Sequence, residues 1–136
     1  MNDTIMYIAI ALFIAILVSG IFLVLKYTKK EKLTDEQVTF LNKQFKKIIG
    51  DIDEKSQIIH LDKLYHKTLV EFGFSWTFWE ILKSKPEQIW DIQKIWELHK
   101  LRNKLVHDFD NHEVIYLKKK SKEFQAEWKK LLLELT

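Results

Sequence analysis

The sequence predicts an all-α protein in which one N-terminal transmembrane helix precedes an antiparallel bundle of four to five helices. Three observations lead to this prediction. A long uncharged apolar run lies near the N-terminus, apolar residues after it recur at helical spacing, and no stretch alternates as a half-buried strand does. We divide the chain into a transmembrane anchor at residues 1–27, a basic flank at 28–33 and a helical domain at 34–136.

The apolar run extends from Thr4 to Leu25 and contains no charged side chain. At about 1.5 Å per residue a helix of this length spans roughly 33 Å, enough to cross a hydrocarbon core of about 30 Å. The alternative is a cleaved signal peptide, which has a basic start and a shorter apolar segment. Because the only charge before the run is Asp3, the sequence favours an anchor that contacts membrane lipid through residues 4–25.

The charges that flank the run predict its orientation. Residues 26–32 carry four lysines and one glutamate, a net charge of +3, whereas residues 33–136 carry 18 basic and 17 acidic side chains. Lysines in a short flank stay on the cytoplasmic side, so we expect the N-terminus outside the cell membrane and the domain in the cytoplasm. The absence of cysteine fits a reducing compartment.

Periodicity and capping signals predict five helices in the domain. Thr34 and Gln37 form a capping box at the first start, and Ser84 to Glu87 has the form of another, with Pro86 in the first turn. Gly50 and Gly73 are the expected helix ends. The predicted helices are Thr34–Gly50, Ser56–Phe72, the aromatic Ser75–Lys83, Pro86–Val106 and Glu113–Leu135.

The predicted helix Pro86–Val106 is apolar on two sides. Its narrow polar stripe, expected to face solvent, consists of Gln93, Glu97, Lys100 and Lys104. Its second apolar side consists of Trp90, Leu98, Leu101 and Leu105. Either the predicted helix Thr34–Gly50 or Ser56–Phe72 of the same chain covers this side, or a second copy of the chain does. We expect a second copy, and therefore a homodimer.

Arg102 is the only arginine in the chain, among 22 basic residues, and lies opposite the solvent stripe. A composition this rich in lysine suggests that an inward arginine is used for its planar, five-donor guanidinium, which holds a phosphate or carboxylate or stacks on a ring. The structural alternative is a buried salt bridge, to Asp62 or Asp91 for example.

Polar side chains gather around Arg102 toward the end of this helix. Asn103 and His107 share a face, and His99 lies one turn earlier. Asp108 to Asn111 breaks the helix, and an end at His107 would allow its imidazole to turn toward Arg102.

The segment Arg102-Asn103-x3-His107 resembles the Arg-polar-x3–5-His signature of HEPN domains (higher eukaryotes and prokaryotes nucleotide-binding), near the end of a long helix before a final helix. The resemblance covers most of residues 33–136 in helix order. It implies metal-independent RNA cleavage at a site built from two protomers. His107 is then the general acid or base, Arg102 stabilises the phosphate, and Asn103 orients one of them. It implies no cofactor.

Other motifs have less specific interpretations. His107-Asp-x-Asp110-x-His112 has metal-ligand residue types, but such polar turns are usually helix breakers, and we expect no metal site. Trp76 and Trp79 are expected to pack or to flank a groove. The lysine run is expected to be a solvated face, to contact RNA phosphates together with His99, or to contact anionic lipid; it consists of Lys118, Lys119, Lys120 and Lys122.

Two functions therefore remain open from the sequence. The first is a membrane-tethered, dimeric HEPN-like ribonuclease or RNA-binding module. The second is a non-catalytic helical module with the same fold, which dimerises or recruits a cytoplasmic protein to the membrane.

Overall fold

The computed structural model describes the backbone of residues 3–27, 31–51, 53–107 and 112–136, and their side chains except those of 25–27 and 51. This part of the chain is all-helical, as predicted. Residues Met1–Glu31 and Lys32–Thr136 form two separate compact units. The helices are α1 (Asp3–Tyr27), α2 (Asp35–Asp51), α3 (Glu54–Phe72), α4 (Phe78–Ser84), α5 (Ile92–His107) and α6 (Val114–Leu135).

The first unit consists mainly of α1. The stretch Asp3–Val24 has a mean hydropathy of 2.8, and none of it is buried within the structure. Its length and composition are sufficient for a helix that crosses a membrane, which agrees with the predicted run from Thr4.

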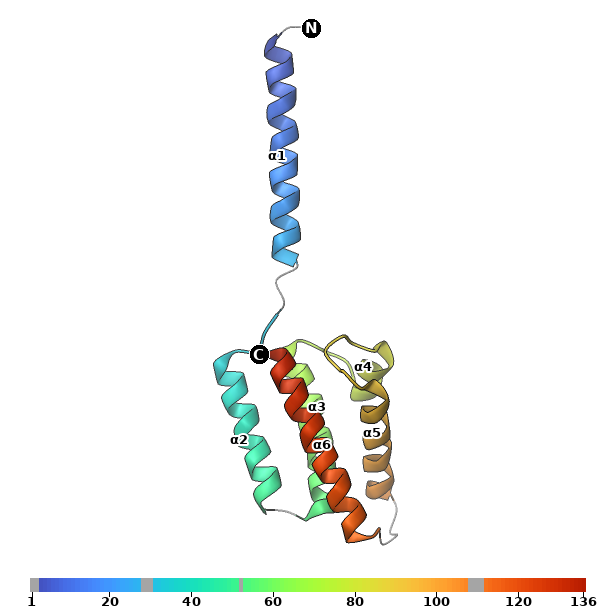
Figure 1. Ribbon diagram of the computed structural model, residues 1–136. Coiled ribbons are helices and arrows are strands. Elements are labelled where there is room, and N and C mark those ends of the chain that lie inside the picture. The colour runs from blue at the N-terminus through green and yellow to red at the C-terminus, as the bar shows by residue number, and fades with distance from the viewer. Residues whose placement is uncertain (1–2, 28–30, 52, 108–111) are drawn as a thin grey trace. The chain divides into compact units, whose positions relative to one another are not determined.

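The second unit is a helical bundle whose long helices run in alternate directions (Figure 1). Within it, α3 packs against α2, α5 and α6. The apolar stripe of α6 is buried in the core and is at most 8 % exposed at each position; it consists of Leu117, Phe124, Trp128, Leu131 and Leu135. The amide of Leu33 donates to the carbonyl of Leu135 at 2.8 Å, so the start of the bundle is fastened to its last turn.

The predicted boundaries of α2 and α3 are close to the observed ones. The Thr34 amide donates to Gln37 Oε1 at 2.9 Å and the Gln37 amide to Thr34 Oγ1 at 3.3 Å, which confirms the capping box. Asp53 caps α3 by accepting from the Ser56 amide, and α3 begins at Glu54, two residues before the predicted start. Gly73 ends α3 as predicted, with a φ of 130° that side chains rarely adopt.

The predicted starts of the next two helices were wrong, whereas their predicted ends lie within one residue of the observed ones. Thr77 and Glu80 form the capping box that starts α4, so Ser75 to Thr77 lie outside the helix. Ser84 ends α4 rather than starting the following helix: its hydroxyl donates to the carbonyl of Ile81 at 2.7 Å, and Lys85 has a φ of 50°. Consequently α5 begins at Ile92, six residues after the predicted start.

The second apolar side of α5 is covered largely by this chain itself. Leu98 and Leu105 are 1 % and 2 % exposed, because α5 packs against both α3 and α6. Trp90 precedes α5 and is 78 % exposed. The expectation that this side is left for a second copy is therefore wrong for Leu98 and Leu105, and dimerisation remains a prediction on other grounds.

Candidate functional site

Asp62 is a buried carboxylate in the middle of α3, on the side that faces α5. Its Oδ1 lies 2.8 Å from His99 Nδ1, and its Oδ2 lies 3.4 Å from Arg102 Nε. A buried carboxylate needs partners of this kind, since an unpaired charge in the interior is strongly unfavourable. One acidic residue of α3 thus binds two polar residues of α5.

Asn103 closes a ring of four polar side chains. Arg102 Nη1 donates to Asn103 Oδ1 at 2.6 Å, and Asn103 Nδ2 lies 3.4 Å from His99 Nε2. Both contacts of the His99 ring nitrogens are hydrogen bonds if His99 carries its proton on Nδ1, donates it to Asp62 and accepts from Asn103 at Nε2. We call these residues, Asp62, His99, Arg102 and Asn103, the Asp62 ring.

Aromatic side chains enclose the imidazole of His99. Phe78 of α4 meets the ring edge-on, with centroids 4.8 Å apart, and Trp96 lies at 6.3 Å. Tyr65 packs against Phe78 at 5.7 Å. Burial raises the pKa of the Tyr65 phenol, and the negative charge of Glu127 raises it further, so this phenol stays neutral. The apolar surroundings restrict His99 to the orientation that the Asp62 ring requires.

Arg102 has the inward direction that the helical wheel predicts, and its structural partner is one of the two that the sequence suggested. Asp62 forms the ion pair, whereas Asp91 accepts from the Lys94 amide at 3.0 Å at the start of α5. Arg102 Nε lies within ion-pair distance of Asp62 without hydrogen-bond geometry. The Arg102 side chain is 26 % exposed, so part of the guanidinium faces outward.

His107 does not belong to the ring. It is the last residue of α5, its side chain is exposed, and it makes no hydrogen bond or ion pair with a described residue. The expected turn of its imidazole toward Arg102 depends on residues 108–111, which lie outside the described part of the chain. The structure therefore brings together three of the predicted site residues, His99, Arg102 and Asn103, and adds Asp62.

The predicted lysine run divides between two faces of α6. Lys120 points toward α5 and binds Glu123 at 2.9 Å, and this hydrogen bond raises the pKa of Lys120. The other three lysines border a shallow depression of about 520 Å³ on α6 and are exposed; they are Lys118, Lys119 and Lys122. Three of the four lysines are thus available to an anionic ligand.

Metal-ligating residues do not cluster in the described part of the chain: no three histidine or acidic side chains lie close enough there to hold an ion. Asp108 and Asp110 of the motif considered above lie outside it.

The arrangement defines a helical bundle with a half-buried arginine site on α5. Comparison with known proteins adds nothing further, because no family model, curated protein or solved structure matches this chain.

Proposed function

We propose that this chain is a membrane-tethered, HEPN-like module that binds RNA at the α5 site and cleaves it without a metal ion. The observation that carries the proposal is the way the Asp62 ring holds Arg102. Asn103 accepts from one Nη1 donor and Asp62 faces the buried Nε, and the other three guanidinium N–H groups make no hydrogen bond or ion pair with a described residue. A partly exposed, pre-oriented guanidinium is well suited to bind a phosphate.

The position of His107 supports a role in acid–base chemistry. An exposed imidazole at the end of α5 is accessible to a substrate, unlike the enclosed His99. In the proposed reaction, His107 removes the proton of a ribose 2′-hydroxyl or protonates the leaving oxygen. Arg102 stabilises the negative charge on the phosphate. In agreement with the HEPN resemblance, the site would be completed by His107 from a second copy.

The membrane part of the proposal rests on α1 and its flank. In α1 the apolar stretch Asp3–Val24 precedes four lysines within residues 26–32, and this order is expected to place the helical unit at the cytoplasmic face of the cell membrane. RNA would then be bound at the membrane surface.

A second candidate function is a non-catalytic module that recruits a cytoplasmic protein or dimerises. The observation that favours it is the ion pair between Arg102 and the 3 % exposed Asp62, since a structural role alone would account for a lone inward arginine.

Substitution of His107 separates the two functions. In the full chain reconstituted in lipid nanodiscs with excess chelator, we expect cleavage of single-stranded RNA. His107→Ala should slow this cleavage by about 10² to 10⁴, the usual value of a general acid or base. The exposed position predicts an unchanged melting temperature. Exposed His60 of α3 offers the matched control, His60→Ala, which should cleave normally.

Intact RNA after incubation with the wild-type chain, over a set of varied sequences, would contradict the catalytic part of the proposal. Equal cleavage by the wild-type and His107→Ala chains would contradict the role of His107.

A further inference from the structure

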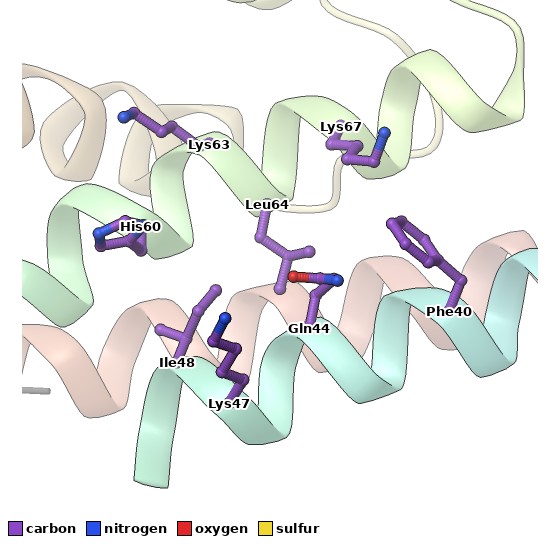
Figure 2. A pocket seen from close by; sticks show the side chains of 8 residues that line it. All are labelled: Phe40, Gln44, Lys47, Ile48, His60, Lys63, Leu64 and Lys67. Carbon is purple, nitrogen blue, oxygen red and sulfur yellow. The ribbon is translucent and has the colours of Figure 1, made fainter. Parts of the chain in front are cut away.

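A groove runs along the outer side of the α2–α3 pair and encloses about 430 Å³ (Figure 2). Its floor is apolar and consists of Phe40 and Ile48 from α2 and Leu64 from α3. Phe40 is 41 % exposed although it is a large aromatic residue, so the floor is open to a ligand. The groove is separate from the α5 site, and the inference drawn from it is independent of the proposed function.

Helical spacing explains how the groove forms. Phe40, Gln44 and Ile48 follow one another at four-residue intervals and therefore line one face of α2. The α3 residues that line the groove recur at three- and four-residue intervals and face the same side; they are His60, Lys63, Leu64 and Lys67. Two parallel stripes of side chains thus border a single channel between antiparallel helices.

The rims of the groove carry positive charge on both sides. Lys47 lies on the α2 rim, and Lys63 and Lys67 lie on the α3 rim, as Figure 2 shows. No carboxylate lines the groove. Lys67 pairs with Glu71 at 3.3 Å and lies over the ring of Phe40, 5.3 Å from its centroid. Since residues 33–136 are close to neutral in total, this concentration of lysine is a local feature of the groove.

The distribution of these charges indicates the kind of ligand. A single-headed lipid needs positive charge at one mouth of an enclosed apolar tunnel. This groove is partly open to solvent and has cationic rims on opposite sides of an apolar floor. An amphipathic helix with acidic residues on both flanks of an apolar stripe is complementary to it in both respects.

We propose that the α2–α3 groove binds an acidic amphipathic helix of a partner protein. The floor from Phe40 to Ile48 spans eight residue steps of α2, about 12 Å, which accommodates roughly two turns of a partner helix. Apolar side chains of that helix contact Phe40, Ile48 and Leu64, and its carboxylates contact Lys47 on one rim and Lys63 on the other.

Binding of designed peptides to the full chain in zwitterionic nanodiscs tests this proposal by fluorescence anisotropy. The probe is a labelled peptide of about 16 residues, long enough to form a helix when bound, with leucines at i, i+4, i+7 and i+11, glutamates on both flanks and alanines elsewhere. One control peptide has lysine in place of every glutamate, and another has the same composition in scrambled order. We expect the acidic probe to bind at least tenfold more tightly than either control and to weaken with added salt.

Two neighbouring lysines of α2 provide matched variants. Lys47 lines the groove and Lys46 is exposed outside it, so Lys47→Glu and Lys46→Glu change the net charge equally. Lys47→Glu should weaken binding by about three- to tenfold and Lys63→Glu by a similar factor, whereas Lys46→Glu should change it less than twofold. Melting temperatures of the variants should equal that of the wild type, because all three side chains are on the surface.

Three results would overturn the proposal. The first is equal binding of the acidic and scrambled peptides, and the second is equal weakening by Lys46→Glu and Lys47→Glu. The third concerns two competitors, dodecanoate and a short single-stranded RNA. If either one displaces the acidic probe, binds more tightly than the probe, and loses affinity in Lys47→Glu, the groove would be assigned to a lipid or to RNA, respectively.

Discussion

Asp62 is the residue on which the geometry of the α5 site depends. It is 3 % exposed and contacts both His99 and Arg102, so its removal leaves a buried imidazole N–H and a guanidinium edge without a carboxylate partner. A buried polar group that loses its partner costs more than the hydrogen bond itself contributes to stability. The arginine site is therefore also a stabilising contact between α3 and α5.

Replacement of Asp62 by asparagine tests this role. Asp62→Asn keeps the shape and one acceptor oxygen but loses the charge that faces Arg102, and we expect the free energy of unfolding to fall by about 1–3 kcal/mol. Asp91→Asn is the matched control: asparagine caps a helix as well as aspartate does, so this change should cost less than about 0.5 kcal/mol.

Denaturant unfolding of residues 32–136, a separate compact unit with its own core, provides the measurement. If Asp62→Asn were as stable as Asp91→Asn, the Asp62 ring would have no structural importance.

Sequence reasoning at the residue scale identified part of this site. The inward direction of Arg102 follows from its position opposite a polar stripe on one helix, and the structure confirms it. The choice between Asp62 and Asp91 depends on how α3 packs against α5. The periodicity of a single helix does not predict this packing. The hydrogen bond from His99 to Asp62 was missed for the same reason, although a buried histidine among apolar residues indicates that some acceptor is near.

At the scale of single elements, the strongest local signals gave correct boundaries. The capping box at Thr34 and the glycine at position 73 act through short-range backbone contacts, and both have the predicted role. The prediction that Ser84 starts a helix was wrong because a serine hydroxyl can donate to a carbonyl in the last turn of a helix as well as cap the start of one. Thr77 and Glu80 had the spacing of a capping box, and reading them would have corrected the start of α4.

The element α1 has a prediction of its own. If α1 anchors the chain with the lysines of residues 26–32 in the cytoplasm, a reporter fused after Thr136 should be active as a cytoplasmic protein. Green fluorescent protein and alkaline phosphatase, fused in parallel to the full chain, would give fluorescence without phosphatase activity. Phosphatase activity would place the helical unit outside and remove it from cytoplasmic RNA, while loss of α1 from the mature chain would identify a signal peptide instead.

At the scale of the whole molecule, the sequence predicted the all-α class and the division into an apolar helix and a bundle. Long, strongly periodic segments carry that information. The sequence did not predict which helices are central: α3 packs against α2, α5 and α6, and α5 packs against α3, α4 and α6. Leu98 and Leu105 are buried within the chain. The proposed homodimer therefore rests on the HEPN resemblance and on exposed apolar residues at the end of α5 and the start of α6, which are Val106, Val114 and Ile115.

The α2–α3 groove was not foreseen either, although all its residues are visible in the sequence. His60, for example, is exposed on α3 and also borders the groove. A groove belongs to two helices at once, and its lining becomes apparent only when their relative rotation is known. A surface groove between two helices is therefore difficult to predict from the sequence pattern of either helix.

The central claim is that Arg102 binds the phosphate of RNA, and the affinity of the full chain for RNA tests it most directly. Binding of a labelled mixed-sequence single-stranded RNA, measured in nanodiscs together with thermal unfolding, should weaken about tenfold or more in Arg102→Lys, because lysine keeps the charge but loses the bidentate fork. Lys104→Gln removes a charge on the exposed side of the same helix and should have a smaller effect. Unchanged RNA affinity in Arg102→Lys, together with a lowered melting temperature, would contradict the claim and leave Arg102 as a structural partner of Asp62.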